Sequence, residues 1–225
     1  MSTDDGDDFD MEYTGATADH DTAMSSRDLS STLITNIADQ AAEDEEAQWR
    51  CDNANGNIIF ETINVTSGHK NRQQMKESRA HISVFQEHAL AAAGVRAAVM
   101  DMAKHKWHMM VGPVDPEHQR SSGGVGIMTK DPLKPIKLQG RTKAYSDAVR
   151  TGRLMAFWID VNGTNLLVGV IYGWTGAQSG NDAARRTSDL VTILIDEFEQ
   201  HPHTLQIIAG DVNGDVDMFP TIQHM

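Results

Sequence analysis

Polar side chains follow several apolar runs of the sequence, at the points where strands are expected to end. Asp211 and Asn213 follow the run "LQIIAG" near the end of the chain. Three other runs end in the same way, at Asn64, at the pair Gln86-Glu87 and at Tyr172. Carboxylates and amides can hold a divalent cation, a carboxylate can activate water, and a phenol can donate a hydrogen bond to an anion. Neighbouring strands would gather these groups on one rim, which is a common place for a ligand site.

Each of these residues also has an ordinary structural explanation. Glu87 can lie where a strand meets water, and Tyr172 can be a core or edge residue of its strand. Asp211 and Asn213 can stabilise a turn, because their side chains bond to nearby backbone groups. Taken singly, the four residues therefore predict no function.

The stretch "DVNGDVD" offers a different interpretation, a calcium-binding loop. Asp211, Asn213 and Asp215 occupy the first, third and fifth positions that such a loop requires. The sixth and twelfth positions require Gly and Glu, but the sequence has Val216 and Ile222 there. A strand also precedes the stretch, where an EF-hand needs a helix. The spacing therefore disfavours calcium binding.

Cysteine and histidine indicate no zinc site. Cys51 is the single cysteine, so a disulfide within the chain and a cysteine-based zinc site are both excluded. The ten histidines are scattered; His105 and His108 lie three residues apart, with no cysteine or group of carboxylates beside them. We therefore expect them to be surface or core histidines rather than zinc ligands.

The elements that must position the rim residues are a mixture of strands and helices. Apolar and β-branched runs predict strands at residues 58–65, 82–85, 121–130, 154–161, 165–174 and 205–210. Helical composition and spacing predict helices at residues 69–80, 91–106 and 181–201. The pair Asn162-Gly163 between two apolar runs predicts a hairpin. This order predicts an α+β fold with paired antiparallel strands rather than a regular βαβ alternation.

The charge of the chain is distributed unevenly. The formal net charge is −13, but residues 1–50 hold 14 acidic and 2 basic residues, whereas residues 51–225 hold 18 and 17. Because the first segment is acidic and poor in apolar residues, we predict a disordered acidic tail over residues 1–54 and a folded domain over residues 55–225. A nearly neutral domain does not exclude a polyanionic substrate, since a local basic cleft or a bound metal ion can supply positive charge.

The sequence shows no targeting or membrane segment. It has no N-terminal apolar leader and no apolar stretch of about 20 residues, the length that a membrane span needs. We therefore expect a soluble intracellular protein, in the nucleus or the cytoplasm, with no obligate protein partner and no membrane association.

Five short motifs occur in the order seen in one known superfamily. They are "INVTSG", "VFQEHAL", "SSGGVGIM", "LLVGVIYGWTGA" and "IIAGDVN", and they lie within residues 57–220. This set resembles the endonuclease/exonuclease/phosphatase superfamily, which includes exonuclease III-like repair nucleases and the endonuclease domains of non-LTR retrotransposons. The resemblance implies a DNase I-like, four-layer α/β/β/α sandwich. It also implies hydrolysis of phosphoesters with Mg²⁺ or Mn²⁺, with nucleic acid, and DNA first of all, as the substrate.

The matching positions imply a role for each rim residue. Glu87 resembles the metal ligand of the superfamily, and Asn64 would complete the ligand sphere or contact the phosphate. Asp211 resembles the residue that positions or deprotonates the attacking water, and Asn213 would orient Asp211 or contact the phosphate. Tyr172 would donate a hydrogen bond to the phosphate or lie near the water. These roles come from the resemblance alone.

The sequence departs from the superfamily pattern after Asn213. The late Asp-His pair of the superfamily has no counterpart, because His224 is too close to Asn213 and follows no suitable strand. The resemblance therefore implies a domain without its C-terminal part and a chain with little or no activity. Arg153, at the start of "GRLMAFW", lies at a position that is also basic in the superfamily, but we expect it to be an ordinary surface arginine.

Three functions are consistent with these residues. The first is a divalent-metal-dependent nuclease of retroelement or repair type. The second is a non-catalytic remnant or binding protein on the same scaffold, which the missing Asp-His pair favours. The third is a phosphomonoesterase, because that activity would use the same groups at the strand ends.

Overall fold

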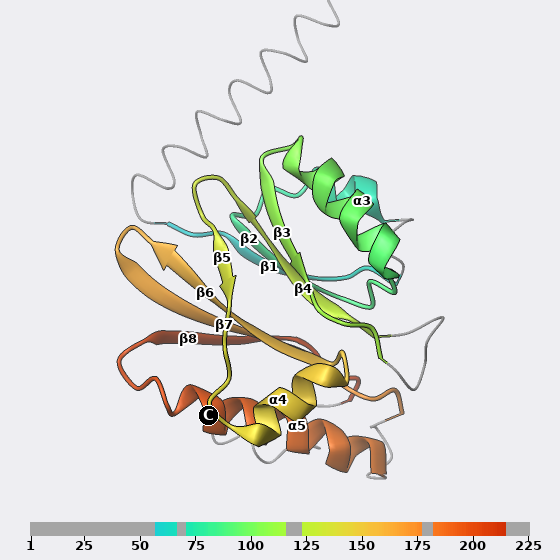
Figure 1. Ribbon diagram of the computed structural model, residues 1–225, viewed down its shortest axis with the longest axis vertical. Helices are drawn as coiled ribbons and strands as arrows, with labels where there is room; N and C mark the ends of the chain where they lie inside the picture. Colours follow the sequence, from blue (N-terminus) through green and yellow to red (C-terminus); the bar gives the residue numbers. More distant parts are fainter. Residues whose placement is uncertain (1–56, 67–70, 116–122, 177–181, 215–225) are drawn as a thin grey trace, which may run out of the picture. The chain divides into compact units, whose positions relative to one another are not determined.

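The computed structural model describes residues 57–66, 71–115, 123–176 and 182–214 (Figure 1). All of them belong to one compact unit, Asp52–Met225. The acidic segment at residues 1–54, Asp215 and His224 lie outside the described residues, so the predictions made for them stay predictions.

The strands of this unit form two four-stranded sheets (Figure 1). Sheet A has the order β1-β2-β4-β3, in which β1 is parallel to β2 and the other pairs are antiparallel. Its strands are β1 (Phe60–Asn64), β2 (Ile82–Gln86), β3 (Trp107–Val111) and β4 (Val125–Lys130). Sheet B has the order β5-β6-β7-β8, in which only β7 and β8 are parallel. Its strands are β5 (Pro135–Lys137), β6 (Leu154–Val161), β7 (Thr164–Tyr172) and β8 (Leu205–Asp211).

The main core lies between the two sheets. Val84 and Ile127 of sheet A pack in one cluster with Phe157 and Val168 of sheet B, and all four side chains are fully buried. Complete burial of a side chain of this size stabilises the fold by about 1.5–3 kcal/mol. β2 is buried on both faces: Val84 lies in the main core, and Phe85 lies in a second cluster with residues of two helices. This two-sided burial explains why three of the four residues of "ISVF" are apolar and why Ser83 among them is also buried.

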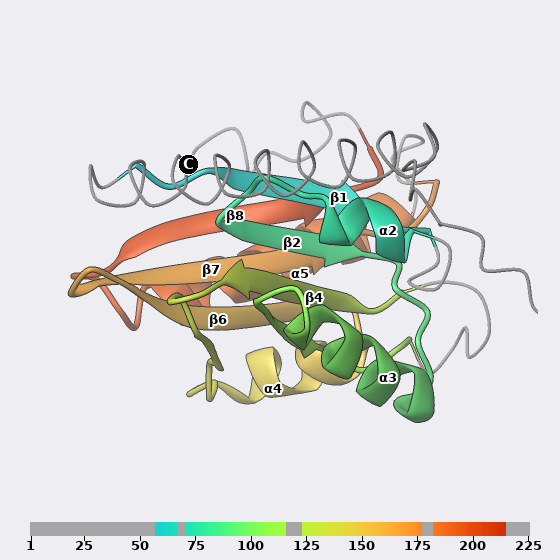
Figure 2. The same ribbon diagram turned by 90° about the horizontal axis from the view of Figure 1, so that it is seen from above.

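Four helices cover the outer faces of the sheets. They are α2 (Arg72–Lys76), α3 (Ala92–Ala103), α4 (Lys143–Arg150) and α5 (Asp182–Phe198). Met75 and Met102, on α2 and α3, pack on the outer face of sheet A, and α5 packs on β7 through Leu194 and Phe198. Figures 1 and 2 show α2 and α3 outside sheet A, and α4 and α5 outside sheet B. The four-layer α/β/β/α arrangement implied by the resemblance is therefore confirmed.

Most of the expected elements are present, including the hairpin at Asn162-Gly163 between β6 and β7. Three elements were not predicted: β3, β5 and α4. β3 reads "WHMMV", which has one β-branched residue, and β5 has three residues and begins with proline. α4 begins after Thr142, whose side-chain oxygen accepts the backbone N–H of Tyr145 at 3.1 Å, a cap that a search for long apolar stripes does not detect. None of the helices in the described ranges has the length and apolar character that a membrane span requires.

Candidate active site

The rim residues predicted from the sequence meet where the two sheets abut. Asn64 ends β1 and Glu87 follows β2, while Tyr172 ends β7 and Asp211 ends β8. Because each of these two strand pairs is parallel, its carboxyl ends lie together. β1 and β8 face each other across the sandwich (Figure 2), so the two pairs of ends form one rim.

Two side-chain hydrogen bonds join the sheets at this rim. Asn64 Nδ2 donates to Asp211 Oδ2 at 3.3 Å, across 147 residues of sequence. Tyr172 Oη donates to Glu87 Oε1, across 85 residues. The structure thus brings together side chains from the ends of four strands, as expected for neighbouring strands.

Glu87 is held in an unusual backbone conformation. Its φ is +60°, in the left-handed region that non-glycine residues adopt at a cost of about 1–3 kcal/mol. The preceding residue, Gln86, is buried and donates through Nε2 to Thr62 Oγ1 at 3.1 Å, which fixes the end of β2 to β1. The turn then directs Glu87 to the rim, where its second carboxylate oxygen accepts no hydrogen bond from the described residues.

Tyr172 is buried and serves as a hydrogen-bond donor. Burial raises the pKa of its phenol, and the neighbouring Glu87 carboxylate raises it further. Arg153 and Asn213 oppose this effect only in part. The hydroxyl therefore stays protonated at neutral pH and donates to Glu87, which fixes the direction of that carboxylate.

Asp211 and Asn213 form a turn whose hydrogen bonds also order the carboxylate. The backbone N–H of Asn213 donates to Asp211 Oδ1 at 2.8 Å. Asn213 has a φ of +53° and donates through Nδ2 to the carbonyl of Gly173 at 2.8 Å. With the bond from Asn64, each oxygen of Asp211 accepts one hydrogen bond, and each keeps a lone pair for a water molecule. The hydrogen bonds of the turn therefore also hold the Asp211 carboxylate in a position where it can bind a water molecule.

Close backbone approach explains the glycine that precedes Asp211. Gly210 has a φ of +141°, and a Cβ built on it would lie 1.9 Å from the carbonyl oxygen of Ile171. A side chain here would force β8 away from β7 and would displace Asp211 from Tyr172, its register partner.

The expectation that Arg153 is a surface residue is wrong. Arg153 is 2% exposed, and its Nε donates to Asp115 Oδ2 at 2.9 Å, in a pair whose two side chains are both buried. Nη1 donates to the carbonyls of Tyr172 at 3.4 Å and Gly173 at 2.8 Å. The guanidinium also lies 4.7 Å from the ring centroid of Trp174 and 5.0 Å from that of Tyr172. The physical reason for its burial is that Asp115 and two carbonyls satisfy the charge.

Arg153 thus supports the side of the rim formed by the ends of β7 and β8. The carbonyl of Gly173 accepts from both Arg153 and Asn213, and the ring of Tyr172 lies under the guanidinium. Sequence reasoning missed the roles of Asp115 and Trp174. Asp115 follows β3 in the stretch "GPVD", 38 residues before its partner, and no local pattern indicates such a pair.

Removal of the Arg153 guanidinium should destabilise the fold. We expect Arg153→Met to lower the free energy of unfolding by about 3 kcal/mol, because the buried charge of Asp115 would lose the cation that offsets it. The double variant Asp115→Asn/Arg153→Met should recover part of this loss. Urea unfolding monitored by tryptophan fluorescence would measure both values. Equal stability of wild type and Arg153→Met would contradict the described pair.

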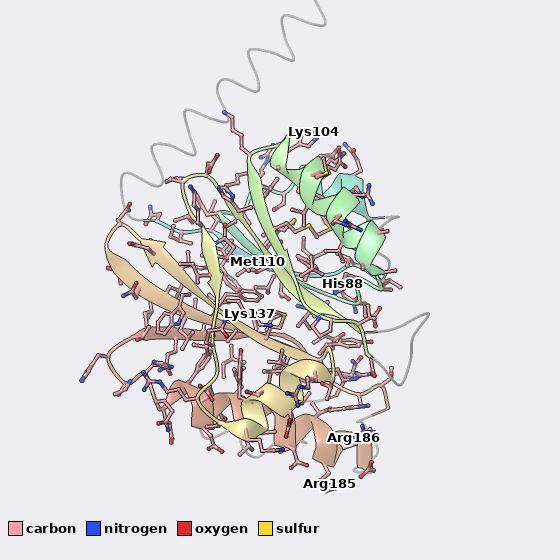
Figure 3. The ribbon with its side chains drawn as sticks, viewed as in Figure 1. His88, Lys104, Met110, Lys137, Arg185 and Arg186 are labelled. Atoms are coloured by element: carbon pink, nitrogen blue, oxygen red, sulfur yellow. The ribbon has the colours of Figure 1, made fainter. Side chains whose placement is uncertain are left out.

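His88 lies directly behind the rim and packs against a glycine. It is 1% exposed and is labelled in Figure 3. A Cβ on Gly124, whose φ is +88°, would lie 2.2 Å from His88 Nε2, so only glycine leaves room for the ring. The backbone N–H of Leu90 donates to His88 Nδ1 at 3.0 Å. Burial lowers the pKa of His88 to about 4, so the ring is neutral at physiological pH.

The low pKa of His88 predicts a loss of stability in mild acid. Between the unfolded pKa of 6.5 and the folded pKa of about 4, only the unfolded chain binds this proton. The free energy of unfolding should therefore fall with decreasing pH in this window, by about 1.4 kcal/mol per pH unit from His88 alone. Urea midpoints of wild type and His88→Gln across this window would isolate the contribution. Parallel pH profiles of the two proteins would refute it.

The rim has the oxygen donors that suit a hard cation. A carboxylate oxygen of Glu87 is available, and the amide oxygen of Asn64 lies at the adjacent strand end, where it accepts from the backbone N–H of Thr66 at 3.0 Å. No cluster of three or more His, Cys, Asp or Glu side chains occurs in the described ranges. This set fits Mg²⁺, which keeps several waters and is often bound through one or two carboxylates. His108 contacts Asp131 instead of belonging to such a cluster.

Several solved structures have a fold similar to that of this chain. The 3′-5′ exonuclease NExo from Neisseria meningitidis superposes with a TM-score of 0.52 and 19% identity, over 69% of this chain and 58% of that chain. An AP endonuclease from Archaeoglobus fulgidus superposes with a TM-score of 0.53 and 14% identity, over 74% of this chain and 68% of that chain. The 3′ phosphatase NExo from Neisseria, bound to a product DNA hairpin, superposes with a TM-score of 0.50 and 18% identity, over 69% of this chain and 58% of that chain.

The chain spans little more than half the length of NExo, and neither a family model nor a curated protein sequence matches it. The structural likeness covers 69% to 74% of this chain. The described residues therefore have a DNase I-like α+β fold.

Proposed function

We propose that the rim hydrolyses phosphodiester bonds of nucleic acid, with DNA as the first substrate to test, and that it requires Mg²⁺ or Mn²⁺. The observation that carries this proposal is the pair of cross-sheet hydrogen bonds, Asn64 to Asp211 and Tyr172 to Glu87. They hold two carboxylates, an amide and a phenol at one edge of a fold shared with nucleases. The NExo structure with a product DNA hairpin supports the choice of substrate.

The charge of the rim itself supports a metal requirement. Glu87 and Asp211 are both acidic, so an approaching phosphodiester would meet repulsion rather than attraction. Glu87 would hold a divalent ion through its available oxygen, with Asn64 beside it. When bound, such an ion would offset the charge of the phosphate and of the developing transition state.

Asp211 is the group that can accept a proton. Its oxygens are fixed by the N–H of Asn213 and the amide of Asn64, so a water molecule bonded to a remaining lone pair would have a defined position. Asp211 would take a proton from this water while the water oxygen bonds to phosphorus. The bond between phosphorus and the leaving sugar oxygen would break, and solvent would protonate the leaving oxygen.

Cleavage of a labelled duplex by the full chain tests the proposal. Because the sequence predicts a chain with little activity, protein is used in excess over an end-labelled DNA duplex, so that a slow single turnover can be measured. We expect strand cleavage with Mg²⁺ and none with EDTA. A 3′-phosphorylated oligonucleotide in a parallel reaction tests the alternative phosphomonoesterase, which the 3′ phosphatase name of one similar structure favours. Phosphate release without strand cleavage would replace our proposal with that alternative, and inertness in both reactions would favour a non-catalytic protein.

Removal of the Tyr172 hydroxyl should weaken catalysis moderately. Tyr172→Phe keeps the ring that packs on Arg153 but frees the Glu87 carboxylate from its donor. We expect the single-turnover rate to fall about tenfold, which corresponds to one hydrogen bond to a charged group. Tyr145→Phe, at another buried tyrosine whose hydroxyl accepts from the backbone of Ala156, is the matched control and should leave the rate unchanged. A full rate for Tyr172→Phe would show that this hydroxyl has no catalytic role.

A further inference from the structure

The outer edge of β3 is open. β3 is the last strand of sheet A and pairs with β4 from Trp107↔Lys130 to Val111↔Gly126. Within the described ranges, no strand pairs with its other side. Alternate residues of an antiparallel edge strand direct their backbone N–H and C=O groups away from the partner, so this edge can receive a further strand.

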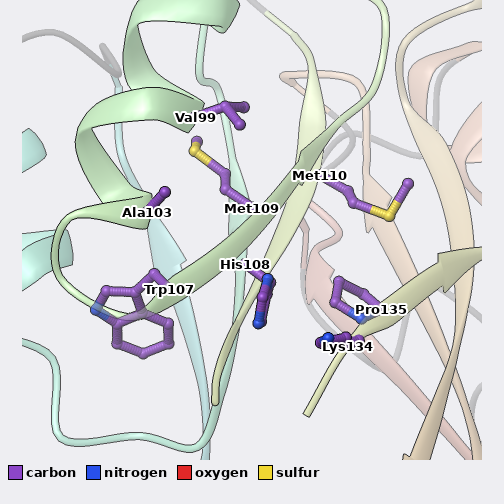
Figure 4. A pocket seen from close by; sticks show the side chains of 8 residues that line it. All are labelled: Val99, Ala103, Trp107, His108, Met109, Met110, Lys134 and Pro135. Carbon is purple, nitrogen blue, oxygen red and sulfur yellow. The ribbon is translucent and has the colours of Figure 1, made fainter. Parts of the chain in front are cut away.

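A cavity of about 300 Å³ lies along this open edge (Figure 4). Val99 and Ala103 of α3 form one wall, and Lys134 and Pro135, at the start of β5, form the other. Residues 107–110 of β3 lie between them. Met100 and Ile136, next in sequence to the two walls, are 70% and 65% exposed, and are among the few large apolar side chains that the described surface exposes. The groove is therefore suited to an apolar side chain.

Positive charge surrounds this groove. Residues 103–111 and 130–137 contain five lysines and one carboxylate, Asp131, whereas residues 51–225 as a whole are nearly balanced. Asp131 contacts His108, and Lys130 lies 5.2 Å from the ring centroid of Trp107. Lys104 and Lys137 mark the two sides of the region in Figure 3. A ligand that follows β3 would meet lysines on both sides.

We propose that this groove binds an extended, acidic segment of a partner protein, which adds a strand to the edge of β3 and places an apolar side chain in the cavity. The lysines select acidic side chains on the added strand. A peptide fits better than nucleic acid, because Trp107 is 2% exposed and cannot stack on a base. Lys130, the partner of Trp107, follows Thr129, the partner of Ile82, so the Trp107 end of the groove lies at the opposite end of sheet A from Glu87, and β4 separates β3 from β2.

A labelled peptide tests this proposal with the full chain. The probe is a fluorescein-labelled peptide of about ten alternating glutamate and leucine residues, long enough to cover β3 and both flanks. We expect saturable binding by fluorescence anisotropy. Methylation of every second backbone nitrogen should weaken binding at least about tenfold, because it removes the donors that a ladder needs. A peptide with lysine in place of glutamate should not bind.

Charge reversal on the protein locates the site. Lys104→Glu/Lys134→Glu should weaken binding at least about tenfold. The matched control Lys143→Glu/Arg150→Glu, which makes the same charge change on α4, should have little effect. Equal binding of the methylated peptide, equal binding by the groove variant, or full displacement by a DNA oligonucleotide would overturn the proposal. Each result is independent of whether the rim cleaves DNA.

Discussion

Replacement of Glu87 by glutamine is expected to lower the rate of Mg²⁺-dependent DNA cleavage about 10³-fold. Glutamine has nearly the same shape and keeps an oxygen that can accept from Tyr172, so the left-handed turn and the rim should be preserved. The neutral amide cannot offset the charge of a cation. The proposed centre would then bind its metal weakly and leave the phosphate charge largely uncompensated.

Metal binding provides a second measurement that does not depend on turnover. Mn²⁺ binding to the full chain, measured by calorimetry, should weaken in Glu87→Gln by at least about tenfold. Glu199→Gln, at an exposed position after α5, is the matched control for both measurements. Normal cleavage with normal Mn²⁺ affinity in Glu87→Gln would remove Glu87 from the site.

Replacement of Asp211 by asparagine is expected to lower the cleavage rate by a similar factor, about 10³-fold, without loss of Mn²⁺ binding. The carboxylate accepts from the backbone of Asn213 and from the side chain of Asn64, so it is oriented but still able to accept a proton. An amide cannot accept that proton. Its NH₂ group would also face either the N–H of Asn213 or the amide of Asn64, so one of these two hydrogen bonds would be lost.

Mn²⁺ affinity distinguishes the roles of Glu87 and Asp211, because Asp211→Asn should lose the cleavage rate but retain Mn²⁺ binding, whereas Glu87→Gln should lose both. Asp196→Asn, on the exposed face of α5, is the matched control for the charge change. If Asp211→Asn lost metal affinity to the same extent as Glu87→Gln, Asp211 would be a metal ligand rather than the acceptor of the water proton.

The strand-end residues could be predicted because the core fixes them. Strand runs rich in apolar residues, such as "ISVF", which is buried, and "LQIIAG", which is partly buried, must end where the sheet ends, so Glu87 and Asp211 were expected at an edge. The resemblance then suggested that those edges coincide. The hydrogen bonds between the sheets depend on how the two sheets pack together. The periodicity of the sequence contains no information on that packing, so these bonds could not be predicted.

Arg153 shows the limit of reading a sequence locally. An arginine at the start of an apolar strand is most often exposed, and its burial depends on Asp115, 38 residues away, and on two carbonyls at the end of another strand. The short elements β3 and β5 were missed for a related reason. Their positions are set by pairing with β4 and β6 rather than by their own composition.

The most direct test of the account is the single-turnover cleavage of an end-labelled DNA duplex by the full chain, with wild type, Glu87→Gln and Asp211→Asn prepared in parallel. We expect cleavage by wild type that requires Mg²⁺ and that both variants lose, while Glu199→Gln and Asp196→Asn retain it. Mg²⁺-dependent cleavage that persists in both rim variants would contradict the assignment of this rim as the active site.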